Sequence, residues 1–274
     1  MKLVDVRLAT LSEMGAVKQL WSKSFGDKDP YLSWYFDNVS SAGNTVVCTH
    51  EGQVSASLQL IDYDVNIGGS IYKACYIAGV CTDEKFRNKG YGSKIMKFAE
   101  EEAARRNKDF VFLCPAIEGF YEKLGYNYWG SLYENTVLPD EAAKQGCRKA
   151  DKSDIDYILQ VYNDFVQNHS GYTIRTRTDF MRIMKAHELF GGGIYLTEEG
   201  GYFICEKSEQ RAHINEMICP IDEVTGFIDY GKIIVRSKYD FGGGENKPKY
   251  LYKICSDMDE NVFKEKGQYI NILY

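Results

Sequence analysis

The sequence contains one faint pattern twice, and this repeat limits what the chain can fold into. Three pairs of segments match in the same order along the 274 residues: 6–14 with 147–155, 46–52 with 194–200, and 75–81 with 213–219. Chance can produce one such match, but three in a single order argue for tandem copies of one fold.

Each copy begins with the signals of a short strand, a cap and an amphipathic helix. In the first copy, Thr10 and Glu13 have the spacing of a capping box. We therefore predict an α/β chain (an α+β mixed sheet) of two domains, each a twisted, mostly antiparallel sheet flanked by helices. The predicted domains span residues 1–140 and 146–274, with residues 139–146 as the linker.

One stretch of the first copy has the arrangement of an anion site. Residues 76–82 are an apolar run that predicts a buried strand, and residues 93–100 have the apolar spacing of an amphipathic helix. Between them lies the sequence Arg87-Asn88-Lys89-Gly90-Tyr91-Gly92. Because a glycine turn before a helix directs free backbone N–H groups at an anion, we predict a phosphate-containing ligand here. Gly79, inside the strand, predicts a bulge or a close backbone approach.

The second copy lacks this arrangement. No glycine turn follows Cys219, and residues 232–236 predict a strand rather than a helix. The glycine triplets at 191–193 and 242–244 are not followed by the Gly-Lys-Ser/Thr sequence and helix of a phosphate-binding loop, so we interpret both as turns before strands. The second domain is therefore predicted to be degenerate, without a phosphate site.

A second motif, Phe120-Tyr121-Glu122-Lys123-Leu124-Gly125-Tyr126, follows one predicted helix and one predicted strand later. Together with the glycine turn, it resembles the GCN5-related N-acetyltransferase (GNAT) superfamily in order and spacing. The tandem arrangement, with residues 161–165 and 192–196, is similar to the enhanced intracellular survival family. Members of that family usually carry a third, sterol-carrier-like domain, whereas we expect this chain to stop near the end of its second copy.

The resemblance implies that the first domain binds acetyl-CoA as the acyl donor. The pantetheine arm would pair with the strand at 76–82, and the pyrophosphate would lie on the glycine turn. The two glycines of the turn admit phosphate oxygens close to the backbone, while the basic and hydroxyl side chains add charge and a donor. The implied cofactor-binding residues are Val80, Cys81, Thr82, Arg87, Asn88, Lys89, Gly90, Tyr91, Gly92 and Ser93.

The resemblance also implies a catalytic role for Tyr121. When an amine attacks a thioester and expels a thiolate, a nearby phenol can return the proton, and the superfamily uses a tyrosine at this position as the general acid. The backbone N–H of Val80 or Cys81 would meet the oxyanion of the tetrahedral intermediate. The alternative is that Tyr121 only packs, with its hydroxyl outward.

The general base stays open. A primary amine arrives protonated, and the carboxylates that could accept its proton, directly or through water, are Glu118, Asp62, Asp64 and Asp83. In the enhanced intracellular survival proteins the terminal carboxylate of the chain reaches the site, which makes Tyr274 a second catalytic candidate. The alternative is a terminal strand whose end faces solvent. The aromatic segment 29–37 either packs between helices or holds the amine by cation–π contact.

Composition argues against several classes of partner. The net charge of −6, with no basic pole, argues against nucleic acid. No apolar run has the length of a membrane span, and the N-terminus lacks a signal-peptide core, so we expect a cytoplasmic protein without a membrane partner. The eight cysteines form no Cys-x-x-Cys motif and no histidine stands at metal-ligand spacing, so we predict small apolar cysteines and no metal site.

The resemblance, with the residues that carry it, implies an N-acetyltransferase that moves an acetyl group from acetyl-CoA to a primary amine by direct attack in a ternary complex. The alternative is a non-catalytic acyl-CoA-binding or regulatory tandem-GNAT module. The acceptor, a small molecule or a peptide amine, stays open at this point, and so does the formation of a homo-oligomer.

Overall fold

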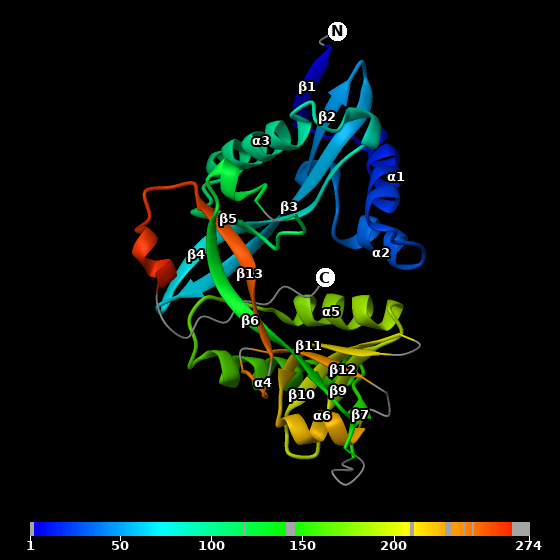
Figure 1. The fold of residues 1–274 in the computed structure, drawn as a ribbon, viewed down its shortest axis with the longest axis vertical. Coiled ribbons are helices and arrows are strands. Elements are labelled where there is room, and N and C mark those ends of the chain that lie inside the picture. Colours follow the sequence, from blue (N-terminus) through cyan, green and yellow to red (C-terminus); the bar gives the residue numbers. More distant parts are fainter. Residues whose placement is uncertain are drawn as a thin grey trace. The chain divides into compact units, whose positions relative to one another are not determined.

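The computed structural model describes residues 3–117, 119–140, 146–208, 211–227, 232–237, 239–242 and 244–264 (Figure 1). The chain divides into two compact units. The first consists of Met1–Val65, Ile71–Trp129 and Tyr250–Val262, and the second of Asn66–Ser70, Gly130–Lys249 and Phe263–Tyr274.

This division differs from the predicted domains 1–140 and 146–274, and strand pairing explains the difference. Strand β6 (Asn127–Val137) pairs antiparallel with β12 (Ile233–Ser237) in the second unit. Strand β13 (Glu245–Ile254) pairs antiparallel with β5 (Phe110–Leu113) in the first unit. Each copy of the repeat therefore supplies the last strand of the other unit, which places residues 250–262 with the first copy.

The sheet of the first unit has the strand order β1-β2-β3-β4-β5-β13. Its remaining strands are β1 (Val4–Leu8), β2 (Thr45–His50), β3 (Gln53–Ile67) and β4 (Ser70–Thr82). The helices are α1 (Met14–Phe25), α2 (Tyr31–Asn38) and α3 (Tyr91–Arg105), with short 3-10 turns at Leu11–Glu13, Ala42–Asn44, Glu84–Phe86 and Glu122–Leu124. The pairs β1–β2 and β2–β3 are antiparallel, and β4–β5 is parallel.

Side-chain alternation along the strands produces two buried faces in this unit. On one face Val46, Cys48 and Leu58 pack with Ile95 and Met96 of α3, in a core that is almost completely buried. The helices α1 and α2 lie on the other side of the sheet (Figure 1). Cys75 and Ile77 of β4 pack in the core that contains α3, whereas Ser70, Ile71 and Lys73 at the start of the strand are exposed.

The second unit has a sheet with the matching order β7-β9-β10-β11-β12-β6. Its other strands are β7 (Arg148–Lys149), β9 (Gly193–Leu196), β10 (Tyr202–Lys207) and β11 (Ala212–Ile218), and its helices are α4 (Ile155–Val166), α5 (Arg177–Leu189) and α6 (Ile221–Phe227). Short elements of this unit are β8 (Tyr172–Thr173) and the 3-10 turn at Lys152–Asp154. A further 3-10 turn at Glu260–Lys264 begins in the first unit and ends in the second. The pair β11–β12 is parallel and the other described pairs of this sheet are antiparallel. This pattern matches the first unit, where β4–β5 is parallel and β1–β2 and β2–β3 are antiparallel.

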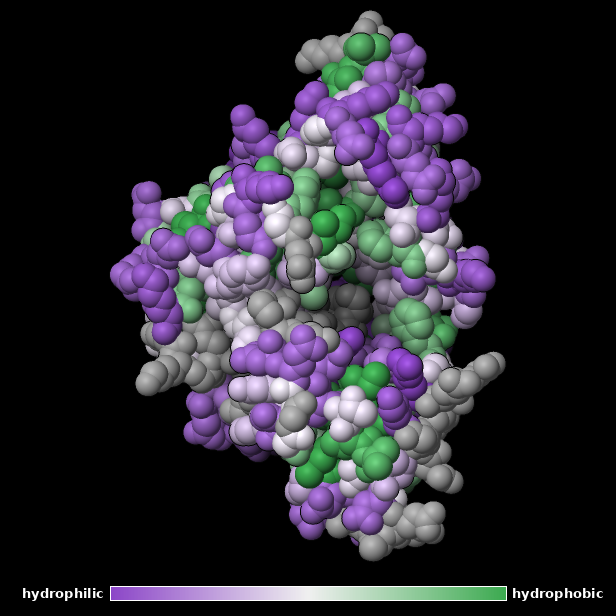
Figure 2. All heavy atoms as spheres, in the orientation of Figure 1, coloured by the Kyte–Doolittle hydropathy of each residue, from purple (hydrophilic) through white to green (hydrophobic). Residues whose placement is uncertain are grey.

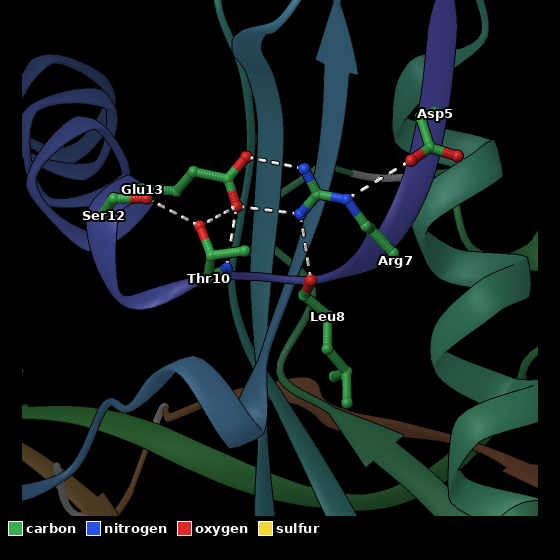
Figure 3. Close-up of polar contacts among 6 residues, drawn as sticks. All are labelled: Asp5, Arg7, Leu8, Thr10, Ser12 and Glu13. Carbon is green, nitrogen blue, oxygen red and sulfur yellow. Dashed lines mark hydrogen bonds and ion pairs between the residues drawn. The ribbon is translucent and has the colours of Figure 1, made fainter. Parts of the chain in front are cut away.

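The repeat extends to individual hydrogen bonds. In the first copy, Arg7 donates from both terminal nitrogens to Glu13 at 2.8 Å, and the backbone N–H of Thr10 donates to Glu13 Oε2 at 2.8 Å (Figure 3). In the second copy, Arg148 donates to both oxygens of Asp154 at 2.8 and 2.6 Å, and the N–H of Asp151 donates to Asp154 Oδ2 at 2.9 Å. The predicted tandem architecture and the capping box at Thr10 are confirmed.

Other sequence expectations are confirmed in the described part of the second unit. Residues 233–237 form a strand, β9 begins at Gly193, and β13 follows the triplet at 242–244 directly. The eight cysteines are free, and four of them (Cys48, Cys75, Cys81 and Cys205) are buried in the cores as small apolar side chains.

Candidate active site

The parallel strands β4 and β5 separate in the middle of the first unit. Their pairing joins Ala74, Cys75 and Tyr76 to Phe110, Val111 and Phe112, and in the described residues it goes no further. Strand β5 ends at Leu113, whereas β4 continues to Thr82. The segment that contains Val80, Cys81 and Thr82 therefore has an edge that β5 leaves unpaired, and an extended chain could add to it.

Gly79 lies on this segment in a left-handed conformation, with φ of +58°. A Cβ atom at Gly79 would lie 1.9 Å from Cζ3 of Trp21 and 2.6 Å from Oε1 of Gln59. Both distances are far inside van der Waals contact, so only glycine fits beneath the Trp21 ring. The close backbone approach that the sequence predicted at Gly79 is confirmed.

The glycine turn after β4 is open at the start of α3. Asn88 and Gly90 both have left-handed backbones, with φ of 62° and 75°, and α3 begins at Tyr91, two residues earlier than the predicted helix. A Cβ atom at Gly90 would meet no atom within 4 Å. No described side chain caps α3. The backbone N–H groups of Tyr91, Gly92 and Ser93, in its first turn, therefore have no acceptor within the helix. This geometry suits an anion with several oxygens.

Basic side chains flank the turn on its solvent side. The Nε of Arg87 donates to the carbonyl oxygen of Thr82 at 3.4 Å, and its guanidinium lies 3.8 Å from Glu84. The Nζ of Lys89 lies 5.1 Å from the centroid of the Phe86 ring. Both cations are exposed, while Ser93 is half-buried. The two cations can therefore turn toward an anion without breaking a buried interaction.

Tyr91 differs from the other predicted ligands because its side chain belongs to the core. The side chain is buried, its hydroxyl shares a hydrogen bond of 2.6 Å with Nδ1 of His50, and its ring stacks on Phe86 at 6.0 Å. Only the backbone N–H of Tyr91 faces the turn.

Tyr121 begins the 3-10 turn that follows β5, and its side chain is 5% exposed. Its ring makes edge-to-face contacts with Phe120 and Tyr126, at centroid distances of 4.9 and 6.1 Å. Burial raises the pKa of Tyr121 to about 12, and the nearby thiol of Cys114 adds to the shift. The phenol is therefore neutral at physiological pH and can act as a proton donor.

The Phe120 ring connects this turn to the glycine turn. Its Cζ atom would lie 3.4 Å from a Cβ at Gly92, and Oγ1 of Thr82 would lie 3.7 Å from the same point. The end of β4, the start of α3 and the Tyr121 turn therefore meet at one place in the first unit.

Lys253 of β13 is a residue of this region that sequence reasoning missed. Its Nζ donates to the carbonyl oxygen of Leu124 and to Oε2 of Glu100, both at 2.8 Å. Lys253 stands more than a hundred residues after its two partners, so no local pattern in the sequence could have indicated the contact.

The three described candidates for the general base are all paired with lysines. Asp62 pairs with Lys108 at 2.8 Å, Asp64 with Lys73 at 2.7 Å, and Asp83 with Lys23 at 3.2 Å. A carboxylate that is already paired with a cation is a weaker base, so none of the three stands out. Glu118 and Tyr274 lie outside the described residues.

The aromatic segment at 29–37 forms α2 and packs against α1. The ring of Trp21 lies 4.7 Å from that of Tyr35 and 5.9 Å from that of Phe36, and Tyr31 and Tyr35 are buried. On the face drawn in Figure 2, apolar side chains gather between α3 and α1, with hydrophilic side chains over the outer surfaces of these helices. Packing between helices therefore accounts for most of the aromatic residues of this segment.

The described residues contain no group of three His, Cys, Asp or Glu side chains arranged to hold a metal ion. No helix among them is long and apolar enough to cross a membrane.

Comparisons with known proteins agree with this geometry. Residues 5–129 match the model of the acetyltransferase (GNAT) domain. The first copy is a GNAT domain. This domain contains the separated strands, the glycine turn and Tyr121.

Solved structures extend the same fold over both units. A GCN5-related N-acetyltransferase from Kribbella flavida has a TM-score of 0.74 at 18% identity, covering 92% of this chain and 72% of its own. A probable N-acyltransferase from Enterococcus faecalis has the same TM-score and identity, covering 93% and 73%. Eis1 from Mycobacterium abscessus has a TM-score of 0.66 at 10% identity, covering 92% and 74%. The chain therefore has the tandem GNAT-type fold that these structures share.

Proposed function

We propose that the first unit transfers an acetyl group from acetyl-CoA to a primary amine in a ternary complex. The open glycine turn at the start of α3 carries this proposal, because a Cβ at Gly90 would meet no protein atom and free N–H groups surround the position. The unpaired edge of β4 beside it supports a site for the pantetheine arm. In this proposal the pyrophosphate lies on Gly90, Gly92 and Ser93, with Arg87 and Lys89 nearby.

The chemical step uses the backbone of β4 and the phenol of Tyr121. The amine nitrogen attacks the thioester carbon, and an N–H of Val80 or Cys81 stabilises the oxyanion that forms. As the C–S bond breaks, the sulfur takes the proton of the Tyr121 phenol, and the amine loses its own proton to a base. Burial favours a neutral thiol over a thiolate at this site, in the same direction as it raises the pKa of buried Cys81.

We propose that the second unit binds no acetyl-CoA. Its β11 ends at Ile218 and α6 follows from Ile221, without an intervening glycine turn. For the whole chain we propose a small-molecule or peptide amine as the partner and, on the basis of the acidic composition, no nucleic acid. We propose no membrane partner and a place in the cytoplasm, because no apolar run of the sequence has the length of a membrane span.

Calorimetric titration with acetyl-CoA tests the proposal. The wild type should bind with micromolar affinity, and Gly90→Val should lose binding because the side chain would occupy the space of the phosphate. Gly69→Val is the matched control, because Gly69 also has a positive φ, +83°, and also meets no atom within 4 Å. Equal losses in both variants, or no binding by the wild type, would contradict the proposed site.

A further inference from the structure

Lys253 donates hydrogen bonds both to the turn of Tyr121 and to helix α3. One of its two hydrogen bonds goes to the carbonyl oxygen of Leu124 and the other to Glu100, each at 2.8 Å. Leu124 lies in the turn that starts at Tyr121, and Glu100 lies on the helix that starts at the glycine turn. A single ammonium group therefore joins the two parts of the proposed site.

The surroundings of Lys253 make these hydrogen bonds strong. Its side chain is 31% exposed and that of Glu100 is 17% exposed. The Nζ also lies 5.5 Å from the centroid of the Tyr126 ring. Charge-assisted hydrogen bonds that are partly shielded from water hold their geometry better than exposed ion pairs do.

Backbone hydrogen bonds within the turn connect Leu124 to Tyr121. The N–H groups of Leu124 and Tyr126 donate to the carbonyl oxygen of Tyr121 at 2.9 and 3.2 Å. The Tyr126 ring, which lies under the Lys253 ammonium, contacts the Tyr121 ring edge-on at 6.1 Å. Lys253 thus contacts both the backbone and the aromatic neighbour that orient Tyr121.

We propose that Lys253 is a positioning residue for acetyl transfer, which holds the Tyr121 phenol at the correct place relative to the donor on α3. The inference rests on the proposed function, because Lys253 acts through Tyr121. Lys253 belongs to β13, so the C-terminal part of the chain contributes to the chemistry of the first unit. A general acid must lie within hydrogen-bond reach of the atom that it protonates, and small displacements cost rate steeply.

A double-mutant cycle with Lys253→Met and Tyr121→Phe tests this role. Turnover is read as thiol release from acetyl-CoA, with lysine amide, glucosamine and spermidine as acceptor amines. Lys253→Met should lower kcat by roughly 10-fold or more and leave the Kd of acetyl-CoA within about 2-fold. In the Tyr121→Phe background the same change should alter kcat less than about 2-fold, because the group that it positions is gone. Lys253→Arg, which keeps the charge, should recover part of kcat.

The control is Lys97→Met, which removes an exposed lysine of α3 that lies 4.0 Å from Glu101 and should leave kcat unchanged. Losses from Lys253→Met that are equal in both backgrounds would overturn the inference and leave a purely structural role. Full activity of Tyr121→Phe would instead contradict the proposed acid, and no thiol release with any amine would remove the proposed function and the inference with it. If Lys253→Met does not fold, Glu100→Gln weakens the same contact and enters the same cycle.

Discussion

Leu251→Ala tests whether the C-terminal strand β13 is part of the folded first unit, as its pairing with β5 indicates. Leu251 is fully buried, lies opposite Leu113 in the β5–β13 pairing, and packs in the core that contains Tyr121 and Tyr126. Removing its side-chain methyl groups from such a core should lower the free energy of unfolding by about 3 kcal/mol, within the range measured for buried Leu→Ala changes. A cost of that size raises the population of the locally unfolded unit by roughly 150-fold.

Native-state hydrogen exchange measures where this destabilisation falls. Protection should decrease by about two orders of magnitude in β5 and α3 and change little in β11 and β12. Acetyl-CoA should restore part of the protection in β5 and α3, because the ligand stabilises the folded unit that binds it. Ile233→Ala is the matched control, since Ile233 is equally buried on β12 and its loss should affect the second unit instead.

The opposite pattern would refute this reasoning. If Leu251→Ala lowered protection in β11 and β12 and left β5 and α3 unchanged, the C-terminal strand would belong energetically to the second unit. The domain boundary predicted from the sequence, near residue 140, would then describe the folding units better than strand pairing does.

Two further predictions concern protons. Tyr121→Phe should lower kcat by roughly 10²–10⁴-fold with acetyl-CoA affinity unchanged. Because the pKa of Tyr121 is about 12, the phenol stays protonated, so kcat of the wild type should show no decline due to Tyr121 below about pH 10; a decline there that Tyr121→Phe abolishes would contradict the assignment. Hydrogen bonds from Arg7 lower the pKa of Glu13 to about 2 from its usual 4.5, so Glu13 contributes stability above pH 4.5 that is lost as the pH falls toward 2. Glu13→Gln should lower the free energy of unfolding by about 1 kcal/mol at pH 7. Denaturant titrations should show that this difference from the wild type shrinks between pH 5 and pH 2. A difference that stays constant over this range would exclude the ion pair as its source.

Much of the site could be predicted because its signals are local. The left-handed residues of the glycine turn, the start of α3 and the turn at Tyr121 each depend on a few neighbouring residues, whose conformational preferences are visible in the sequence. Gly79 is an intermediate case. The glycine indicated a close approach, but the sequence could not say that the Trp21 ring was the group that approaches.

Tyr91 shows what local reasoning leaves out. Its position in the motif predicts a cofactor contact, and the structure adds that its side chain packs against His50 and Phe86, because burying an aromatic ring in the core is favourable. The general base is a second case. The acidic candidates looked equivalent in the sequence, and the structure pairs each of the three described ones with a lysine, of which Lys108 and Lys23 come from distant segments.

The sequence by itself determined the tandem repeat, the fold class and the elements that surround the glycine turn, because these follow from short-range periodicity and turn chemistry. Only the tertiary structure decided that β6 and β13 complete the sheet of the other copy and that Lys253 contacts the Tyr121 turn. The physical reason is that strand partners are selected by packing and hydrogen bonding between segments far apart in the chain. An edge strand pairs with whichever segment buries its apolar face and satisfies its backbone, and no local pattern identifies that segment.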